Sequence, residues 1–242
     1  MMKSFTYAWE LYKSNLGLIA LSAISLIIAF LIPVFASLPT YNDMGGIFVR
    51  TSSLYLNLNP INTAIIIASV IFSLLFISFA SVVINVIAKH SRTKTSVKTA
   101  VLHSLEKYTG RVFAILLLYS ILIFAVNVLF FWTNYSGIIT SIVALLLIPI
   151  FFYAPSSVVI DEHNALRAMR ASAKFFFKDI WNFVAWVIAL IITLSVIDFI
   201  VIAISGSVLS SYIMLVISSI FILPFFLMLQ GEMYISRFKL LK

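Results

Sequence analysis

Long apolar runs separated by short polar segments dominate this chain. Six runs are long enough to cross a bilayer, whose hydrocarbon core takes about 20 residues of helix. Each run must be helical, because lipid offers the backbone no hydrogen-bonding partner. The predicted spans are 16–38, 62–88, 112–132, 137–160, 181–205 and 210–233. The pattern predicts an all-α, polytopic membrane protein that forms one integral membrane domain, residues 1–242.

Composition excludes the main soluble classes. Hydrophobic residues make up 63% of the chain and charged residues 10%, whereas soluble domains carry about 25% charged residues. The chain has no cysteine, which excludes a disulfide framework and thiolate metal sites. We therefore expect neither a water-soluble enzyme nor a disordered regulator.

The placement of the cations predicts the orientation. All of the 16 Lys and Arg residues except Arg50 fall before span one, between spans two and three, between spans four and five, or after span six. Cationic loops face the cytoplasm. We therefore expect both termini to be cytoplasmic in the cell (plasma) membrane. The net charge of +8 then indicates anionic lipid headgroups as partners, and not nucleic acid.

Short amphipathic segments precede spans one, three and five. In the first, Phe5, Ala8, Trp9 and Tyr12 recur at helical spacing. Basic amphipathic helices beside a span usually lie in the interface with the apolar face toward lipid and the cations toward headgroups. The cations of the second and third segments are therefore candidate headgroup contacts: Lys94, Lys98, Lys107, Arg167, Arg170, Lys174 and Lys178.

These segments predict a threefold organisation. Each unit would contain one basic interfacial helix and one transmembrane hairpin, with units at about 1–88, 89–160 and 161–242. An offset of 96 residues aligns Tyr12 with Tyr108, and an offset of 164 aligns Asn15 with Asp179. The alternative is that any chain with an even number of spans and basic inner loops looks periodic.

Two stretches carry a resemblance to a known family. One runs from Pro155 through a β-branched segment to the acids Asp161 and Glu162, and continues into a basic helix with Ala165 and Ser172. The other is the opening segment 5–15. Together they resemble the YciC-like and glycerophosphodiester phosphodiesterase membrane-domain group of six-helix proteins. The resemblance implies a six-helix membrane fold. It implies no catalytic residue, because the phosphodiesterase chemistry of the namesake proteins belongs to a separate soluble domain that these residues do not contain.

One ionisable residue lies well inside a predicted span. Asp198 is 17 residues after Trp181, about 26 Å along a helix, and charged groups inside a bilayer are costly. Asn127 and Arg50 are candidate partners in an intramembrane polar site. The alternatives are a protonated carboxyl, or one that hydrogen-bonds to Ser195.

The remaining polar residues predict no catalytic, metal or cofactor site. Asp161 and Glu162 are expected to start the following helix, and the alternative is metal binding or acid–base chemistry with His163. Four prolines, at 33, 149, 155 and 224, fall in or beside spans and are expected to kink them.

The leading functional hypothesis is a non-enzymatic membrane scaffold, assembly or accessory module. Its basic cytoplasmic face would engage anionic lipid, a protein partner or a second copy of the chain. The alternatives are a small-molecule or ion transporter or channel, and a lipid-modifying membrane enzyme that uses Asp161, Glu162 and His163.

Overall fold

The computed structural model describes residues 2–38, 40–43, 46–49, 60–90 and 97–236. Two short strands, β1 (Thr40–Asp43) and β2 (Gly46–Val49), pair antiparallel with Thr40 opposite Val49, where the sequence predicts only a loop. All other elements are helices: α1 (Met2–Ser14), α2 (Leu16–Phe35), α4 (Pro60–His90), α5 (Val97–Leu129), α6 (Ser136–Phe151), α7 (Ala154–Ile160), α8 (Ala165–Lys178), α9 (Ile180–Ile217), the π-helix η2 (Ser218–Ile222) and α10 (Leu223–Ile235).

Six helical segments are long and apolar enough to cross a membrane, which confirms the predicted fold class. They are Leu16–Phe35, Pro60–His90, Thr99–Leu129, Ser136–Ile160, Ile180–Gly206 and Leu209–Ile235. The last two meet at Gly206, whose φ of 73° lies in the left-handed region that glycine enters without steric cost.

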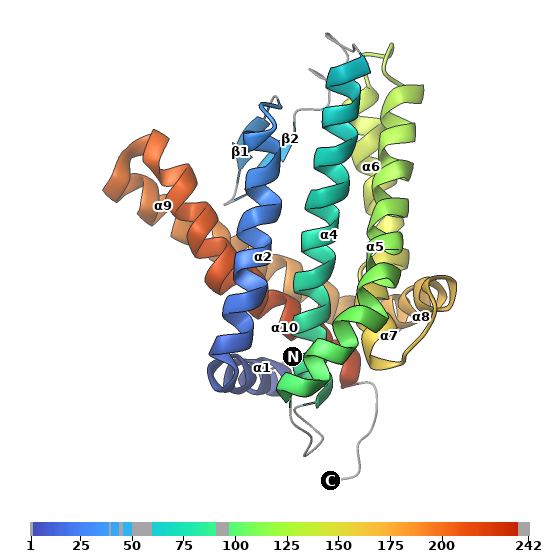
Figure 1. Ribbon diagram of the computed structural model, residues 1–242, viewed down its shortest axis with the longest axis vertical. Coiled ribbons are helices and arrows are strands. Elements are labelled where there is room, and N and C mark those ends of the chain that lie inside the picture. The colour runs from blue at the N-terminus through green and yellow to red at the C-terminus, as the bar shows by residue number, and fades with distance from the viewer. Residues whose placement is uncertain (1, 39, 44–45, 50–59, 91–96, 237–242) are drawn as a thin grey trace.

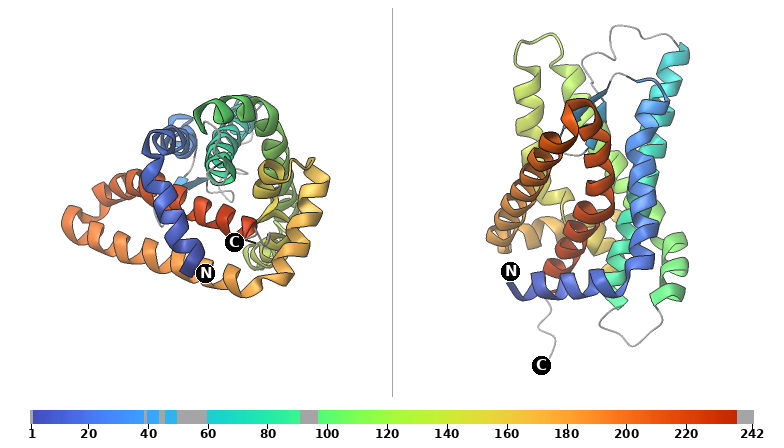
Figure 2. Two further views of the ribbon diagram at one scale, coloured as in Figure 1. Left: turned by 90° about the horizontal axis from the view of Figure 1, so that it is seen from below. Right: turned by 90° about the vertical axis from the view of Figure 1, so that its left-hand side faces the viewer.

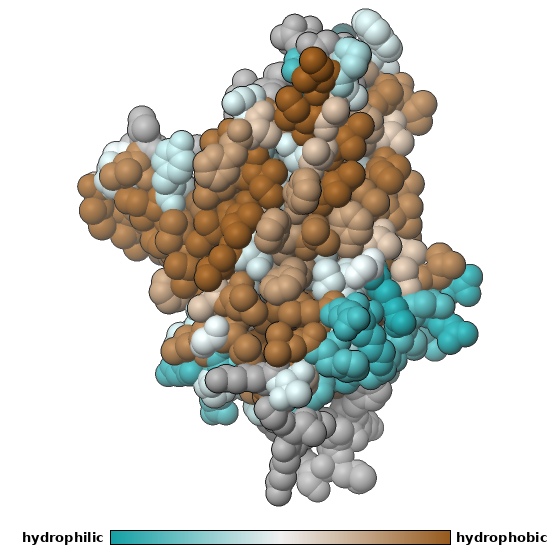
Figure 3. Space-filling view, viewed as in Figure 1, coloured by the Kyte–Doolittle hydropathy of each residue, from teal (hydrophilic) through white to brown (hydrophobic). Residues whose placement is uncertain are grey.

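The helices are arranged as an upright bundle closed at one end. Helices α2, α4, α5 and α6 run upright, and α1 lies across the lower end in Figures 1 and 2. Helix α8, the start of α5 and the end of α10 lie at that same end (Figure 1). We call it the basic end, and its elements are α1, α8, the first turns of α5 and the loop 161–164. Figure 3 shows hydrophilic residues there, below a broad hydrophobic belt.

The most densely packed part of the protein lies toward the basic end. Every residue of α4 from Ala80 to Ala88 is buried, and so is every residue of α10 from Met228 to Ile235. A helix that is buried on all sides must be surrounded by protein, and α4 is enclosed there by α5, α7 and α10. Toward the other end the helices expose large apolar side chains such as Leu145 and Leu146, as lipid-facing surfaces require.

Two of the three predicted amphipathic helices form separate helices that turn into a span at one corner residue. Asn15 joins α1 to α2 with φ −123° and ψ 29°, and Asp179 joins α8 to α9 with φ −128° and ψ 33°. These are the two positions that the offset of 164 residues aligns. The middle segment instead continues into its span as one helix, α5. The threefold duplication itself stays a prediction.

The apolar faces of α1 and α8 pack on the bundle, so the expectation that they face lipid is wrong for their central residues. Ala8 and Tyr12 of α1 are buried, and so are Met169 and Phe176 of α8. The bundle end offers these helices an apolar surface of its own, which buries the same side chains that an interface would. Phe5 and Trp9 of α1 and Leu166 of α8 stay exposed.

Proline 33 lies inside α2, and a neighbouring helix compensates for the donor that it lacks. A proline has no N–H for the carbonyl oxygen four residues earlier, here that of Ala29. The hydroxyl of Ser73 in α4 donates a hydrogen bond to this oxygen over 2.9 Å. Such replacement donors allow prolines in membrane helices.

Proline 224 is compensated in the same way from a more distant part of the chain. The carbonyl oxygen four residues earlier belongs to Ile220, and the Tyr12 hydroxyl of α1 donates to it over 2.9 Å. The Tyr12 ring also lies edge-on to Phe225. Helix α1 is thereby fixed to α10 and η2 at the basic end.

Span four is broken between α6 and α7, at Phe152 and Tyr153. In a continuous helix the Tyr153 N–H would donate to the carbonyl of Pro149. Here the Ser172 hydroxyl of α8 takes both places: it accepts from the Tyr153 N–H at 3.0 Å and donates to the Pro149 carbonyl at 2.9 Å. The Gln230 amide of α10 donates to the Phe152 carbonyl. Side chains from two other helices therefore satisfy the backbone at this break.

Candidate functional site: the basic end

The loop between α7 and α8 brings the acidic residues of the basic end together. Asn164, not Asp161 or Glu162, caps α8, because its side-chain oxygen accepts from the Arg167 N–H at 3.0 Å. The expectation that the two acids start this helix is therefore wrong. A short polar side chain directly before the helix is the preferred cap, and it leaves both carboxylates available to other elements.

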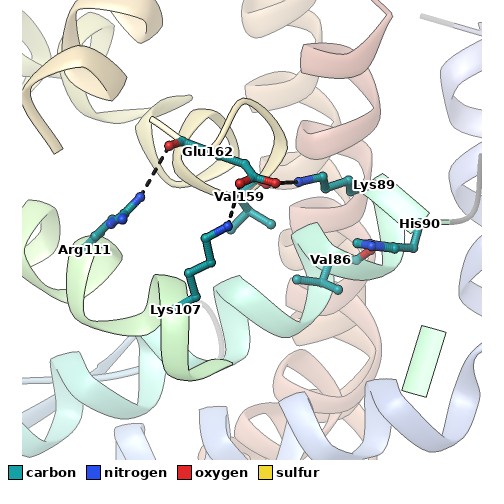
Figure 4. Close-up of polar contacts among 7 residues, drawn as sticks. All are labelled: Val86, Lys89, His90, Lys107, Arg111, Val159 and Glu162. Atoms are coloured by element: carbon teal, nitrogen blue, oxygen red, sulfur yellow. Dashed lines mark hydrogen bonds and ion pairs between the residues drawn. The ribbon is translucent and has the colours of Figure 1, made fainter. Parts of the chain in front are cut away.

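Glu162 is the centre of an ion cluster that joins three elements (Figure 4). Its carboxylate lies 2.9 Å from Lys89 Nζ of α4 and 2.6 Å from Lys107 Nζ of α5. Arg111 donates to its backbone carbonyl at 3.3 Å, and Lys89 also donates to the Val159 carbonyl at 3.0 Å. The backbone of Glu162 has a φ of 58°, a strained value for a residue other than glycine.

The electrostatics of this cluster favour an ionised Glu162. Hydrogen bonds from Lys107 and Lys89 lower the pKa of its carboxyl to about 2, because cationic donors stabilise the charged form. Lys107, a predicted headgroup contact, is thus already paired within the protein. The cluster holds α4, α5 and the 161–164 loop together at the basic end.

Asp161, Ser157 and His163 form a second polar group, which does not have the geometry of a catalytic triad. Asp161 Oδ2 accepts from the Tyr234 hydroxyl at 2.6 Å. His163 Nδ1 lies 3.0 Å from Ser157 Oγ and 3.6 Å from Asp161 Oδ2. A Ser–His–Asp relay needs the serine and the aspartate on different ring nitrogens, and here both contact Nδ1. Ser157 is also fully buried.

Four cations form an exposed stripe along α8, which we call the α8 stripe: Arg167, Arg170, Lys174 and Lys178. Their side chains make no hydrogen bond or ion pair with any residue that the structure describes. The opposite face, including Ser172 and Phe175, is buried. Two large side chains beside the stripe are also exposed, Phe177 by 70% and Trp181 by 81%. The stripe therefore presents unpaired charge next to apolar anchors.

Of the remaining predicted headgroup contacts, Lys94 lies outside the described residues. Lys98 belongs to α5, but its side chain is outside the described part.

Of the predicted intramembrane polar site, the two described members, Asp198 and Asn127, are not brought together. Asp198 is half-buried on α9 and makes no hydrogen bond or ion pair with the described residues, Asn127 included. The alternative bond to Ser195 is not formed either. Helix α9 leans to one side of the bundle and α5, which carries Asn127, lies on the other (Figure 1). Arg50 is outside the described residues.

The contacts that fix the basic end were only partly visible in the sequence. Tyr234 lies near the end of span six, a position typical of interfacial aromatics, yet it is fully buried and donates to Asp161. In the sequence, Lys89 and Arg111 are only two of the cations that predict the orientation, and nothing local shows that they contact Glu162. Within the described ranges no three His, Asp or Glu residues are grouped to hold a metal ion.

Comparisons with protein-family models, curated proteins and solved structures find no significant match to this chain. The resemblance to the YciC-like and glycerophosphodiester phosphodiesterase membrane-domain group therefore stays a prediction. What the structure shows is a multi-pass helical membrane protein.

Proposed function

We propose that this protein is a non-enzymatic scaffold or accessory module of the plasma membrane whose α8 stripe binds anionic lipid headgroups. The single observation that carries the proposal is the stripe of four exposed cations without acidic partners among the described residues. Unpaired cations at a membrane boundary attract anionic lipid by about 1 kcal/mol each.

The packing of α8 supports a binding role over a merely solvated helix. The buried face of α8 is fixed to the bundle through Ser172 and Phe175, so the stripe keeps its direction. Exposed Trp181 and Phe177 are side chains that anchor proteins at the headgroup level. A rigid basic surface beside such anchors suits lipid phosphate groups.

Lipid titration tests this role. The protein in phosphatidylcholine nanodiscs is titrated with a fluorescent phosphatidylglycerol, and retained lipid is measured by native mass spectrometry. Neutralising the stripe with Arg167→Gln, Arg170→Gln, Lys174→Gln and Lys178→Gln should weaken binding at least 10-fold, since up to about 4 kcal/mol of attraction is removed before salt screening.

The matched control keeps the charge. Arg167→Lys with Arg170→Lys should bind phosphatidylglycerol like the wild type, and added salt should weaken both. Equal binding by the wild type and the neutralised protein would overturn the proposal.

The orientation is part of the proposal, with the basic end in the cytoplasm as the distribution of cations favours. Because the chain has no cysteine, single cysteines report the topology directly. An impermeant maleimide should label Asn134→Cys in intact cells and Glu10→Cys only after lysis. Both positions are exposed. The opposite labelling pattern would contradict this orientation.

A further inference from the structure

Asp198 is an isolated charge on an otherwise apolar hairpin. Between Ile180 and Gly231 the sequence contains no other Asp, Glu, Lys or Arg. Asp198 lies 18 residues after Ile180 and eight before the Gly206 turn, about 27 Å and 12 Å along the helix axis. An aspartate side chain is too short to reach water across that length of helix, so this carboxyl lies within the apolar part of the span.

Asp198 is half-buried, and its carboxyl has no hydrogen-bond or ion-pair partner among the described residues. One flank of Asp198 on α9 is exposed and apolar, with Phe199 exposed by 74% and Val196 by 52%, whereas Leu194 and Val201 on the other flank are buried. The two segments of α9, before and after Gly206, lean away from the upright helices (Figures 1 and 3) and form a hydrophobic lobe. Ionisable residues inside membranes almost always face other protein and pair there, yet Asp198 forms no ion pair with any residue that the structure describes.

We infer that the outer half of α9 is a docking surface for a transmembrane helix of another protein that carries a Lys or Arg at the depth of Asp198. The inference rests on the proposed scaffold role and names the chemistry of its partner. Charge complementarity selects the occupant, because an opposite charge relieves the cost of a carboxylate in hydrocarbon. A second copy of this chain would bring two carboxylates together, which disfavours ionisation of both.

The probe is a synthetic leucine–alanine transmembrane peptide with one lysine placed at the depth of Asp198. Its controls are the same peptide with leucine, and with glutamate, at that position. The protein carries Asn134→Cys as a single labelling site, and association is measured by energy transfer between protein and peptide in bilayers. The lysine peptide should associate at least 10-fold more tightly than either control.

The variants assign the effect to Asp198. Asp198→Leu should abolish the preference for lysine, while Ser195→Ala, one turn earlier on α9, should leave it unchanged. Thermal unfolding of Asp198→Leu at or above the wild-type temperature shows that the fold is intact. The variant with a neutralised α8 stripe should keep the lysine preference, so failure of lipid binding and failure of helix docking are separate results.

Three results would overturn the inference. The first is equal association of the lysine and leucine peptides. The second is energy transfer between two copies of the protein that Asp198→Leu removes, which makes a second copy the occupant. The third is a protein with intact Arg50 that shows no preference for the lysine peptide, and an Arg50→Gln variant that does. Asp198 would then already be paired with Arg50 within the chain.

Discussion

Replacing Ser172 by alanine tests how the break in span four is held. The Ser172 hydroxyl is fully buried and serves two backbone groups, the Tyr153 N–H and the Pro149 carbonyl. Its removal leaves one donor and one acceptor without this partner, and an unsatisfied buried group costs about 1–3 kcal/mol. Hydrogen bonds between membrane helices average about 0.6 kcal/mol each. Ser172→Ala should therefore lower the free energy of unfolding by about 2–6 kcal/mol, with about 1 kcal/mol as the lower limit.

The free energy is measured by SDS-induced unfolding in mixed micelles. Ser141→Ala is the matched control, because the Ser141 hydroxyl is exposed and donates only to a carbonyl of its own helix. Its cost should be near zero. Hydrogen exchange at the Tyr153 amide supplies a second measurement and should accelerate in Ser172→Ala alone. Equal stability of the two variants would refute the assignment. If the Tyr153 amide exchanges as in the wild type and span four is straight, the Tyr153 N–H has formed the ordinary helical hydrogen bond to the Pro149 carbonyl instead.

Three further predictions follow from single contacts. Glu162→Gln should lower the unfolding temperature. Because the Glu162 pKa is held at about 2, below its ordinary 4.5, the difference in unfolding temperature from the wild type should persist from neutral pH to about 4.5 and vanish as pH falls toward 2. A difference that is already lost above about pH 5 would contradict the ion cluster. Tyr12→Phe should cost about 1–3 kcal/mol, because it leaves the carbonyl that Pro224 cannot serve without a donor, and stability equal to the wild type in SDS titration would count against that role. Gly231→Ala places a Cβ 3.1 Å from Asn85 Oδ1 and should cost about 1–3 kcal/mol, with part of the loss recovered by adding Asn85→Ala.

The fold class followed from the sequence because bilayer thickness and backbone hydrogen bonding leave one solution for a long apolar run. The placement of α1 and α8 did not follow. Their apolar stripes are equally compatible with lipid and with protein, and only the packed bundle shows that Tyr12 and Phe176 are buried against it. Periodicity locates a helical face, but it does not identify what covers that face.

The candidate site was predictable only in part, for a similar reason. The exposed charges of the α8 stripe were visible as cations at helical spacing. The pairing of Glu162 with Lys89 and Lys107 could not be seen in the sequence, because these residues are 73 and 55 positions away from Glu162. The pairing also depends on a backbone bend at Glu162 that no local signal predicted. Asn164 was the missed local signal, because an Asn before a basic helix is a preferred cap.

Hydrogen bonds to backbone groups beside prolines and helix breaks join the predicted units to one another. Tyr12 joins the first unit to η2, and Ser172 joins the third unit to the second, so the predicted units are bound to one another through the backbone groups that the breaks expose. On α9 the corresponding contact, from the Trp186 indole to the Phe226 carbonyl, lies toward the basic end. Farther out, the described hydroxyl bonds of Thr193 and Ser205 return to carbonyls of α9 itself. Among the described residues, the part of α9 between Thr193 and Ser205 therefore shows no cross-helix hydroxyl bond, and this part carries Asp198. A partner helix that pairs with Asp198 would supply there the kind of contact that the chain supplies for itself elsewhere.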